Sequence, residues 1–92
     1  MIRFVLNKCY GEFSLSDAAL SMLPSDVNYC EYAHRGDEEL LDVVETLGPN
    51  ANGRHADLVI VEIPNNATDY EISAYEGMET LTYVVRGKIH HV

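Results

Sequence analysis

The chain has 92 residues, a length that supports one hydrophobic core and therefore one domain over residues 1–92. A composition of 47% hydrophobic and 23% charged residues is typical of folded proteins and excludes a disordered chain. Fifteen acidic and six basic residues give a net charge of −9, and a field of this sign repels nucleic acids and anionic membrane surfaces. We therefore expect no direct binding to DNA, RNA or membranes.

The cysteine content and the opening residues indicate the compartment. Cys9 and Cys30 are too few for a disulfide framework, so free thiols in a reducing environment are expected. The apolar run in the opening MIRFVLNKCY is shorter than the ~7 to 15 residues of a signal-peptide core or the ~20 of a membrane span. The sequence thus predicts a cytoplasmic protein without a targeting segment.

The first strand and the first helix follow from two different periodicities. Residues 1–7 alternate with a period of two, which predicts a strand with Ile2, Phe4 and Leu6 on one side. After a turn, Ser14 can cap a helix that runs to about residue 23, where Pro24 ends it. The apolar stripe of this helix would consist of Leu15, Ala18, Ala19, Met22 and Leu23.

The middle of the chain contains an ambiguous segment, a helix and a strand. Residues 25–36, SDVNYCEYAHRG, fit either a short edge strand, which their tyrosines favour, or an extended loop. Residues 37–49, DEELLDVVETLGP, predict a helix capped at Asp37 and ended by Gly48 and Pro49. Residues 58–61 are continuously apolar, which predicts a strand buried on both faces at the centre of the sheet.

The last third of the chain alternates again. Tyr70, Ile72 and Ala74 precede a turn at residues 76–77, and alternation resumes afterwards, which predicts a terminal hairpin. A helix over residues 78–85 is the alternative. Together the elements predict an α+β domain with a small mixed sheet of three to five strands, two helices, and a C-terminal hairpin or third helix.

The turn LNKCYGEFSLS, residues 6–16, carries more side-chain chemistry than a connection requires. A strand-to-helix turn directs free amides outward, so a phosphate or carboxylate can bind there. Lys8 and Arg54 would reach one ligand if the first strand and the strand at 58–61 were parallel neighbours, and tyrosines could stack on a base. The candidate ligand-binding residues are Asn7, Lys8, Cys9, Tyr10, Gly11, Phe13, Arg54 and Tyr75.

A purely structural interpretation of this turn is equally good. Gly11 would supply a positive φ, Phe13 would pack on the helix, and Asn7 would bond the backbone. The standard phosphate-loop patterns, with Gly-x4-Gly-Lys-Ser/Thr or Gly-x-Gly-x2-Gly spacing, are absent from the sequence.

Catalytic and metal chemistry have weaker support in the sequence. Cys9 as a nucleophile would need a base such as His34 or His55, and no spacing brings them together. The adjacent His90 and His91 would point to opposite sides of an extended tail, so we expect no metal site and no cofactor. The residues favour a binding protein over an enzyme.

The segment IRFVLNKCYGEFSLS resembles the opening of a widespread family of small uncharacterised proteins of bacteriophages and prophages. That family begins with a strand and a turn like Asn-x-Cys-Tyr-Gly-Gly-Phe-x-Leu-Ser. The segments ELLDVVETLG, NGRHADLVIVEIPNN and YEISAYEGME are similar to later parts of the same family, in register. Two features depart from the family pattern: Glu12 replaces a second glycine, and the ending YVVRGKIHHV replaces a basic-aromatic finish.

The resemblance implies a viral accessory protein in the cytoplasm of an infected bacterial host cell. The first interpretation is a non-enzymatic homo-oligomer that binds a small anionic, nucleotide-derived ligand at the opening turn and so sequesters a bacterial immune signalling molecule. The alternative is an inhibitor or regulator that docks an acidic face on a host or phage protein; this face would comprise Asp37, Glu38, Asp42 and Glu45. A small hydrolase that uses Cys9 is the third.

Overall fold

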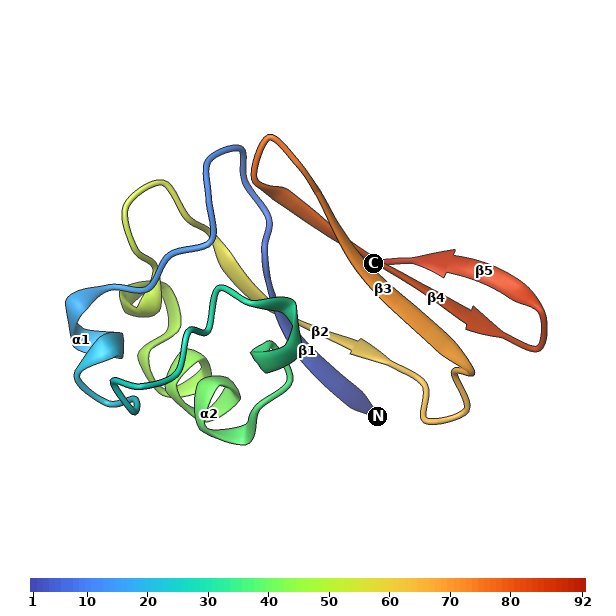
Figure 1. Cartoon of the computed structure of the whole chain (residues 1–92), viewed down its shortest axis with the longest axis horizontal. Coiled ribbons are helices and arrows are strands. Elements are labelled where there is room, and N and C mark those ends of the chain that lie inside the picture. Colours follow the sequence, from blue (N-terminus) through green and yellow to red (C-terminus); the bar gives the residue numbers. More distant parts are fainter.

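Five antiparallel strands form two separate sheets in the computed structural model, which describes all residues 1–92 (Figure 1). The first sheet pairs β1 with β2, and the second is a meander in the order β3-β4-β5. The elements are β1 (Ile2–Asn7), α1 (Asp17–Leu20), the 3₁₀ turn η1 (Tyr32–His34), α2 (Glu38–Leu47), the 3₁₀ turn η2 (Gly48–Ala51), β2 (Leu58–Ile63), β3 (Asp69–Tyr75), β4 (Met78–Val85) and β5 (Lys88–His91). The predicted α+β class, with two helices and a C-terminal hairpin, is confirmed.

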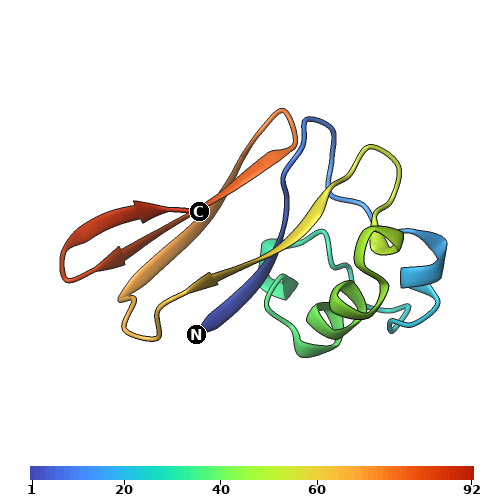
Figure 2. The ribbon, with the colours of Figure 1, turned by 180° about the vertical axis from the view of Figure 1, so that it is seen from behind.

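The two-stranded sheet separates two apolar clusters. Figure 1 shows the helices on one side of this sheet and the meander on the other. Because side chains alternate along a strand, Val5 points to the cluster beneath the helices. Phe4 and Leu6 point to the second cluster, which includes Ile72 and Leu81 of the meander. The helices, the two-stranded sheet and the meander are thus three successive layers, which Figure 2 shows from behind.

The strand that is buried on both faces is β1, not β2. The last four residues of β1 are all buried, whereas β2 is only partly buried between its buried ends Leu58 and Ile63. The register runs antiparallel from Ile2 opposite Ile63 to Asn7 opposite Leu58. The assumption that these strands are parallel neighbours is therefore wrong, and so is the prediction that residues 58–61 lie at the sheet centre with both faces covered.

The first helix is shorter than the sequence predicts. Its cap is Ser16, whose Oγ accepts a hydrogen bond from the Ala19 N–H at 3.1 Å. Ser14 instead donates its Oγ–H to the Arg54 carbonyl at 3.0 Å, which holds the chain extended at this point. The predicted start at Ser14 and end near residue 23 are therefore wrong, and only one turn forms.

The second helix matches its prediction, and the ambiguous segment before it is the predicted loop. The α2 helix follows Asp37 and ends where Gly48 takes a φ of 55°. The Asp37 carboxylate does not cap the helix, because it lies 2.8 Å from His34 Nδ1. Residues 25–36 form no strand and contain only η1. No helix in the chain is long and apolar enough to cross a membrane.

Two tight turns shape the C-terminal meander. Glu76 and Gly77 have φ values of 50° and 87°, and Arg86 and Gly87 have φ values of 52° and 75°. Two successive positive φ values are typical of the type I′ turn, whose twist matches that of the flanking strands. Residues 78–85 are thus a strand and not a helix, and β5 is a further strand that the sequence did not predict.

Candidate functional site

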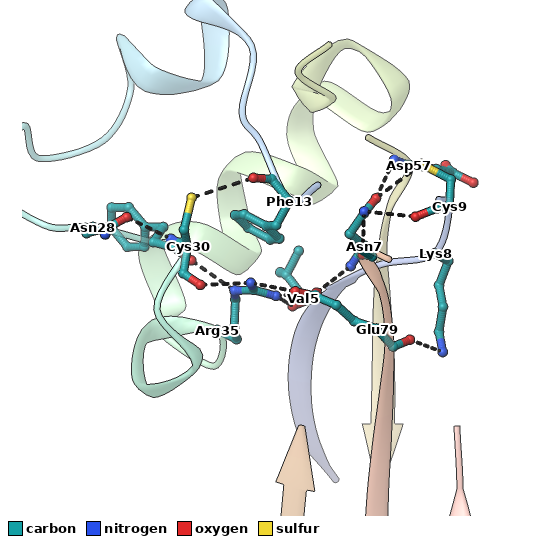
Figure 3. A network of polar contacts seen from close by, with 12 residues as sticks. Val5, Asn7, Lys8, Cys9, Phe13, Asn28, Cys30, Arg35, Asp57 and Glu79 are labelled. Carbon is teal, nitrogen blue, oxygen red and sulfur yellow. Dashed lines mark hydrogen bonds and ion pairs between the residues drawn. The ribbon is translucent and has the colours of Figure 1, made fainter. Parts of the chain in front are cut away.

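Asn7, at the end of β1, is fully buried and joins three segments. Its Nδ2 donates to the carbonyls of Cys9, at 3.1 Å, and Gly77, at 2.9 Å. Its Oδ1 accepts the Asp57 N–H at 2.8 Å (Figure 3). The side chain therefore fixes the opening turn against the β3–β4 turn and the loop before β2, as the structural interpretation expects.

A buried ion pair between Arg35 and Glu79 lies beside Asn7 (Figure 3). The side chains of the pair are 1% and 5% exposed, and the guanidinium contacts both carboxylate oxygens, with Nη2 at 2.8 Å from Oε2. Glu79 also accepts the Asn7 N–H at 2.8 Å. The guanidinium carbon lies 3.6 Å from the centre of the Phe13 ring.

The remaining donors of Arg35 bond backbone carbonyls. Its acceptors are Val5, Tyr29 and Cys30, at 3.2, 2.9 and 2.9 Å. No buried side-chain nitrogen or oxygen lacks a hydrogen-bond partner. The network is thus complete within the protein, and it connects the loop before α2, β1 and the meander.

Neither Arg35 nor Glu79 is among the site residues that the sequence predicts. One signal for Glu79 was available: it alternates in phase with Leu81, so an acid stands at a position that faces the core. An acid at such a position requires a cationic partner. The sequence does not show which cation pairs with Glu79, because Arg35 lies 44 residues away in the ambiguous segment.

Lys8 is also engaged within the chain. Its Nζ donates to the Glu79 carbonyl at 2.7 Å and to the Val92 carbonyl at 2.9 Å. Antiparallel pairing does bring its backbone to the loop before β2, since the Lys8 N–H donates to the Asp57 carbonyl at 2.8 Å. The ammonium, however, points to the meander. The candidate site has two cations, Lys8 and Arg54. Since Lys8 is bound within the chain, only the exposed Arg54 in that loop is left to meet a ligand.

Three connections converge at one end of the molecule, and we call them the apex: the turn at residues 8–12, the loop at 53–57 and the turn at 75–77 (Figures 1 and 2). The Gly11 N–H donates to the Glu76 carbonyl at 3.0 Å. A Cβ on Gly77 would overlap the Gly11 carbonyl, and a Cβ on Gly11 would overlap the His55 carbonyl. The close backbone approach at Gly11 is therefore to the protein itself.

The apex gathers most of the candidate ligand-binding residues. Tyr10 and Tyr75 are 64% and 71% exposed on turns whose backbones touch. Phe13 is the exception, because it is buried on the helix side of the sheet beneath Arg35. A ligand role for this set stays a prediction.

The cysteines show no catalytic pairing. Cys9 Sγ lies 3.2 Å from the His55 carbonyl oxygen and 3.4 Å from Asn7 Oδ1, and its one S–H can donate to either, so its polar contacts are to oxygens and not to an imidazole. Burial raises the pKa of the Cys30 thiol, although the nearby Arg35 opposes this shift. No group of three or more His, Cys, Asp or Glu side chains is arranged to hold a metal ion.

A groove of about 440 Å³ lies away from the apex, beside β1. Its lining comprises residues 1–4, Ala33, residues 36–38, Leu41 and Tyr70. A smaller hollow of about 190 Å³ lies on the meander, between Asp69 and Thr82. Neither hollow contains a residue of the candidate ligand set.

The groove follows a free edge of β1. The Val5 N–H donates to the Arg35 carbonyl at 2.9 Å, away from β2, and the Asn7 N–H is likewise directed to Glu79. Since antiparallel ladders alternate, the N–H and C=O of Arg3 point to this same edge. The sheet thus has an unpaired backbone edge at its first residues, next to the groove.

The rim of the groove is acidic. Glu38 is exposed, Asp37 is half-buried, and Glu39 and Asp42 continue the acidic surface along α2. Arg3 forms an ion pair with Glu45 of α2, and the hydrogen bond to Glu45 is the main cause that raises the pKa of Arg3. Arg3, the one cationic side chain in the groove lining, is therefore already matched by an acid.

Comparison with known proteins identifies no relative: no family model, no curated protein and no solved structure matches this chain. The resemblance to a phage family therefore stays a prediction.

Proposed function

We propose that this protein is a non-enzymatic binding module that takes an extended, basic and apolar segment of a partner protein in the groove beside β1. The observation that carries the proposal is a groove of mixed polar and apolar lining at an unpaired strand edge, with an acidic rim. Occupation of this groove would make the protein an inhibitor or regulator of its partner.

Each feature of the groove contributes a different kind of interaction. An extended segment can bond the free N–H of Arg3, as in strand addition to a sheet edge. Met1, Ile2 and Tyr70 offer apolar contacts for alternate side chains of that segment. The acids at the start of α2 attract cationic side chains, which raises the association rate and excludes acidic partners.

Peptide titration followed by two-dimensional NMR tests this proposal. A peptide of alternating lysine and aliphatic residues should shift the amide signals of Arg3, Gly36 and Leu41. A peptide with glutamate in place of lysine should leave them unchanged, because the rim repels it.

Matched charge variants locate the site. Glu38→Lys should weaken binding of the lysine peptide about tenfold. Glu71→Lys makes the same change on the exposed part of β3 and should have a much smaller effect. Equal losses in the two variants, or shifts confined to other surfaces, would show that net charge and not the groove governs binding.

A second candidate function is supported by the two exposed tyrosines of the apex. A small anionic nucleotide could stack on Tyr10 or Tyr75 and meet Arg54. This candidate ranks second because Lys8 is engaged elsewhere and the apex also exposes Glu12, Asp57 and Glu76. Titration with ATP should shift apex signals in the wild type and not in Tyr10→Ala with Arg54→Ala; no shift in the wild type would reject nucleotide binding there.

A further inference from the structure

The charges of the chain are segregated along its length. All fifteen acidic residues lie at or before Glu79, so residues 80–92 contain none. The same stretch holds Arg86, Lys88, His90 and His91. In a protein with a net charge of −9, only the two ends of the chain have a cationic surplus: residues 1–11, with Arg3 and Lys8, and this C-terminal segment.

The cationic segment forms a projecting hairpin. The β4–β5 pair extends away from the helices and the two-stranded sheet (Figures 1 and 2), and the molecule measures 41 × 26 × 22 Å. All four residues of β5 are exposed, and Ile89 is 66% exposed between Lys88 and His90. An exposed isoleucine next to a lysine has the chemistry that the groove beside β1 should select.

The backbone of β5 has a free edge. The strand pairs with β4 on one side, with Val84 opposite Ile89 and Val85 opposite Lys88, and it ends the sheet on the other side. A lysine on an edge strand discourages indiscriminate pairing, because its charge must be desolvated. The acidic rim at the start of α2, beside the receiving strand, offsets that penalty and makes the pairing selective.

We propose that β5 of one copy occupies the groove beside β1 of a second copy, so that the chain associates head to tail. This inference rests on the proposed function and names its partner as the protein itself. Lys88 and Arg86 would meet Asp37 and Glu38, and Ile89 would enter the apolar part of the groove.

The β5 strand is long enough for the open part of the β1 edge. Arg35 covers this edge at Val5, and Gly36 lies against the Arg3 carbonyl, so the open part consists of the Arg3 N–H and the residues before it. The four residues of β5 span about 13 Å, which exceeds this length.

The contact joins two different surfaces, so it is heterologous. Such contacts form rings when the rotation closes and open chains when it does not. Mutual repulsion between copies of net charge −9 opposes growth, so the association should be concentration-dependent.

Sedimentation velocity of the full chain at constant ionic strength tests the inference. The mean mass of the wild type should rise with concentration, whereas Lys88→Glu and Glu38→Lys should each stay monomeric at concentrations about tenfold higher. An equimolar mixture of the two variants should associate again. The unchanged groove of Lys88→Glu takes the unchanged β5 of Glu38→Lys, and the two surfaces with reversed charge also match each other.

Two control variants change the net charge equally at other places. Arg54→Glu matches Lys88→Glu, and Glu71→Lys matches Glu38→Lys; both should associate like the wild type. A monomeric wild type at all concentrations, or variants that associate like their controls, would overturn the inference. If the lysine peptide still shifts the groove signals in that case, the proposed function stands; if the peptide also fails, both are rejected.

Discussion

Glu79 is the residue whose replacement should cost the most stability. Glu79→Gln leaves the Arg35 guanidinium buried at 1% exposure without its counter-charge. Loss of one partner of a buried pair costs about 3–5 kcal/mol, a large share of the ~5–15 kcal/mol that stabilises a small domain. Urea unfolding followed by circular dichroism should show this loss. The matched variant Glu45→Gln breaks the exposed pair with Arg3 and should cost about 0–1 kcal/mol; equal losses would contradict the structural role of the network.

Tyr29 should make stability fall at high pH. Its hydroxyl donates to Glu39 Oε1 at 3.0 Å, and burial, followed by this bond, raises the pKa of Tyr29 to about 12 from 10.0. The folded state therefore holds the proton more tightly than the unfolded state. The stabilisation is complete below pH ~10 and is lost as pH rises from ~10 to ~12.

Unfolding midpoints measured across this pH range test the role of Tyr29. Tyr29→Phe keeps the ring and removes the ionisable group, so its midpoint should decline less steeply between these pH values. Identical slopes for the variant and the wild type would mean that another group controls the alkaline transition.

The two tight turns of the meander give a matched pair of glycines. Gly77 and Gly87 both have positive φ, so alanine at either position costs about 1–2 kcal/mol of backbone strain. At Gly77 the new Cβ also overlaps the Gly11 carbonyl, whereas nothing lies near Gly87. Gly77→Ala should therefore lower the free energy of unfolding by clearly more than Gly87→Ala. Equal losses in chemical denaturation would mean that the apex contact does not constrain the turn.

The elements with long, regular periodicity could be predicted from the sequence. The strand at residues 2–7, the helix after Asp37 and the first hairpin of the meander follow from alternation, helical spacing and turn residues. The first helix was overestimated because its apolar spacing competes with the bonds of Ser14 to the loop before β2. The last strand was missed because KIHH has one strongly apolar residue and so gives no alternating signal.

The candidate site could be predicted only in part, because much of it joins segments that are far apart in the chain. The turn at residues 6–16 stands out by its composition, and most of its residues do meet at the apex. Neither the Arg35–Glu79 pair nor the groove beside β1 leaves a local pattern, because both unite segments far apart in the chain. Such sites depend on sheet topology, and the pairing of β1 with β2 was assumed with the wrong direction.

At the scale of the whole molecule, the three layers should differ in local stability. The middle layer contacts apolar clusters on both faces, and the Arg35–Glu79 network connects it to the start of β4. The β4–β5 hairpin projects from this core, and none of the β5 residues is buried. In dilute solution, amides of β5 should exchange hydrogen at least about tenfold faster than amides of Phe4 and Leu6.

Concentration then distinguishes local opening from association. If β5 enters the groove of another copy, its amides should become protected as the concentration rises, and the Arg3 amide should gain protection at the same concentrations. Lys88→Glu should keep the fast exchange at both places, because it removes the attraction without changing the fold of the hairpin. Uniform protection of β1 and β5 in dilute solution would instead mean that the hairpin is as stable as the core, and that its exposed face does not loosen it.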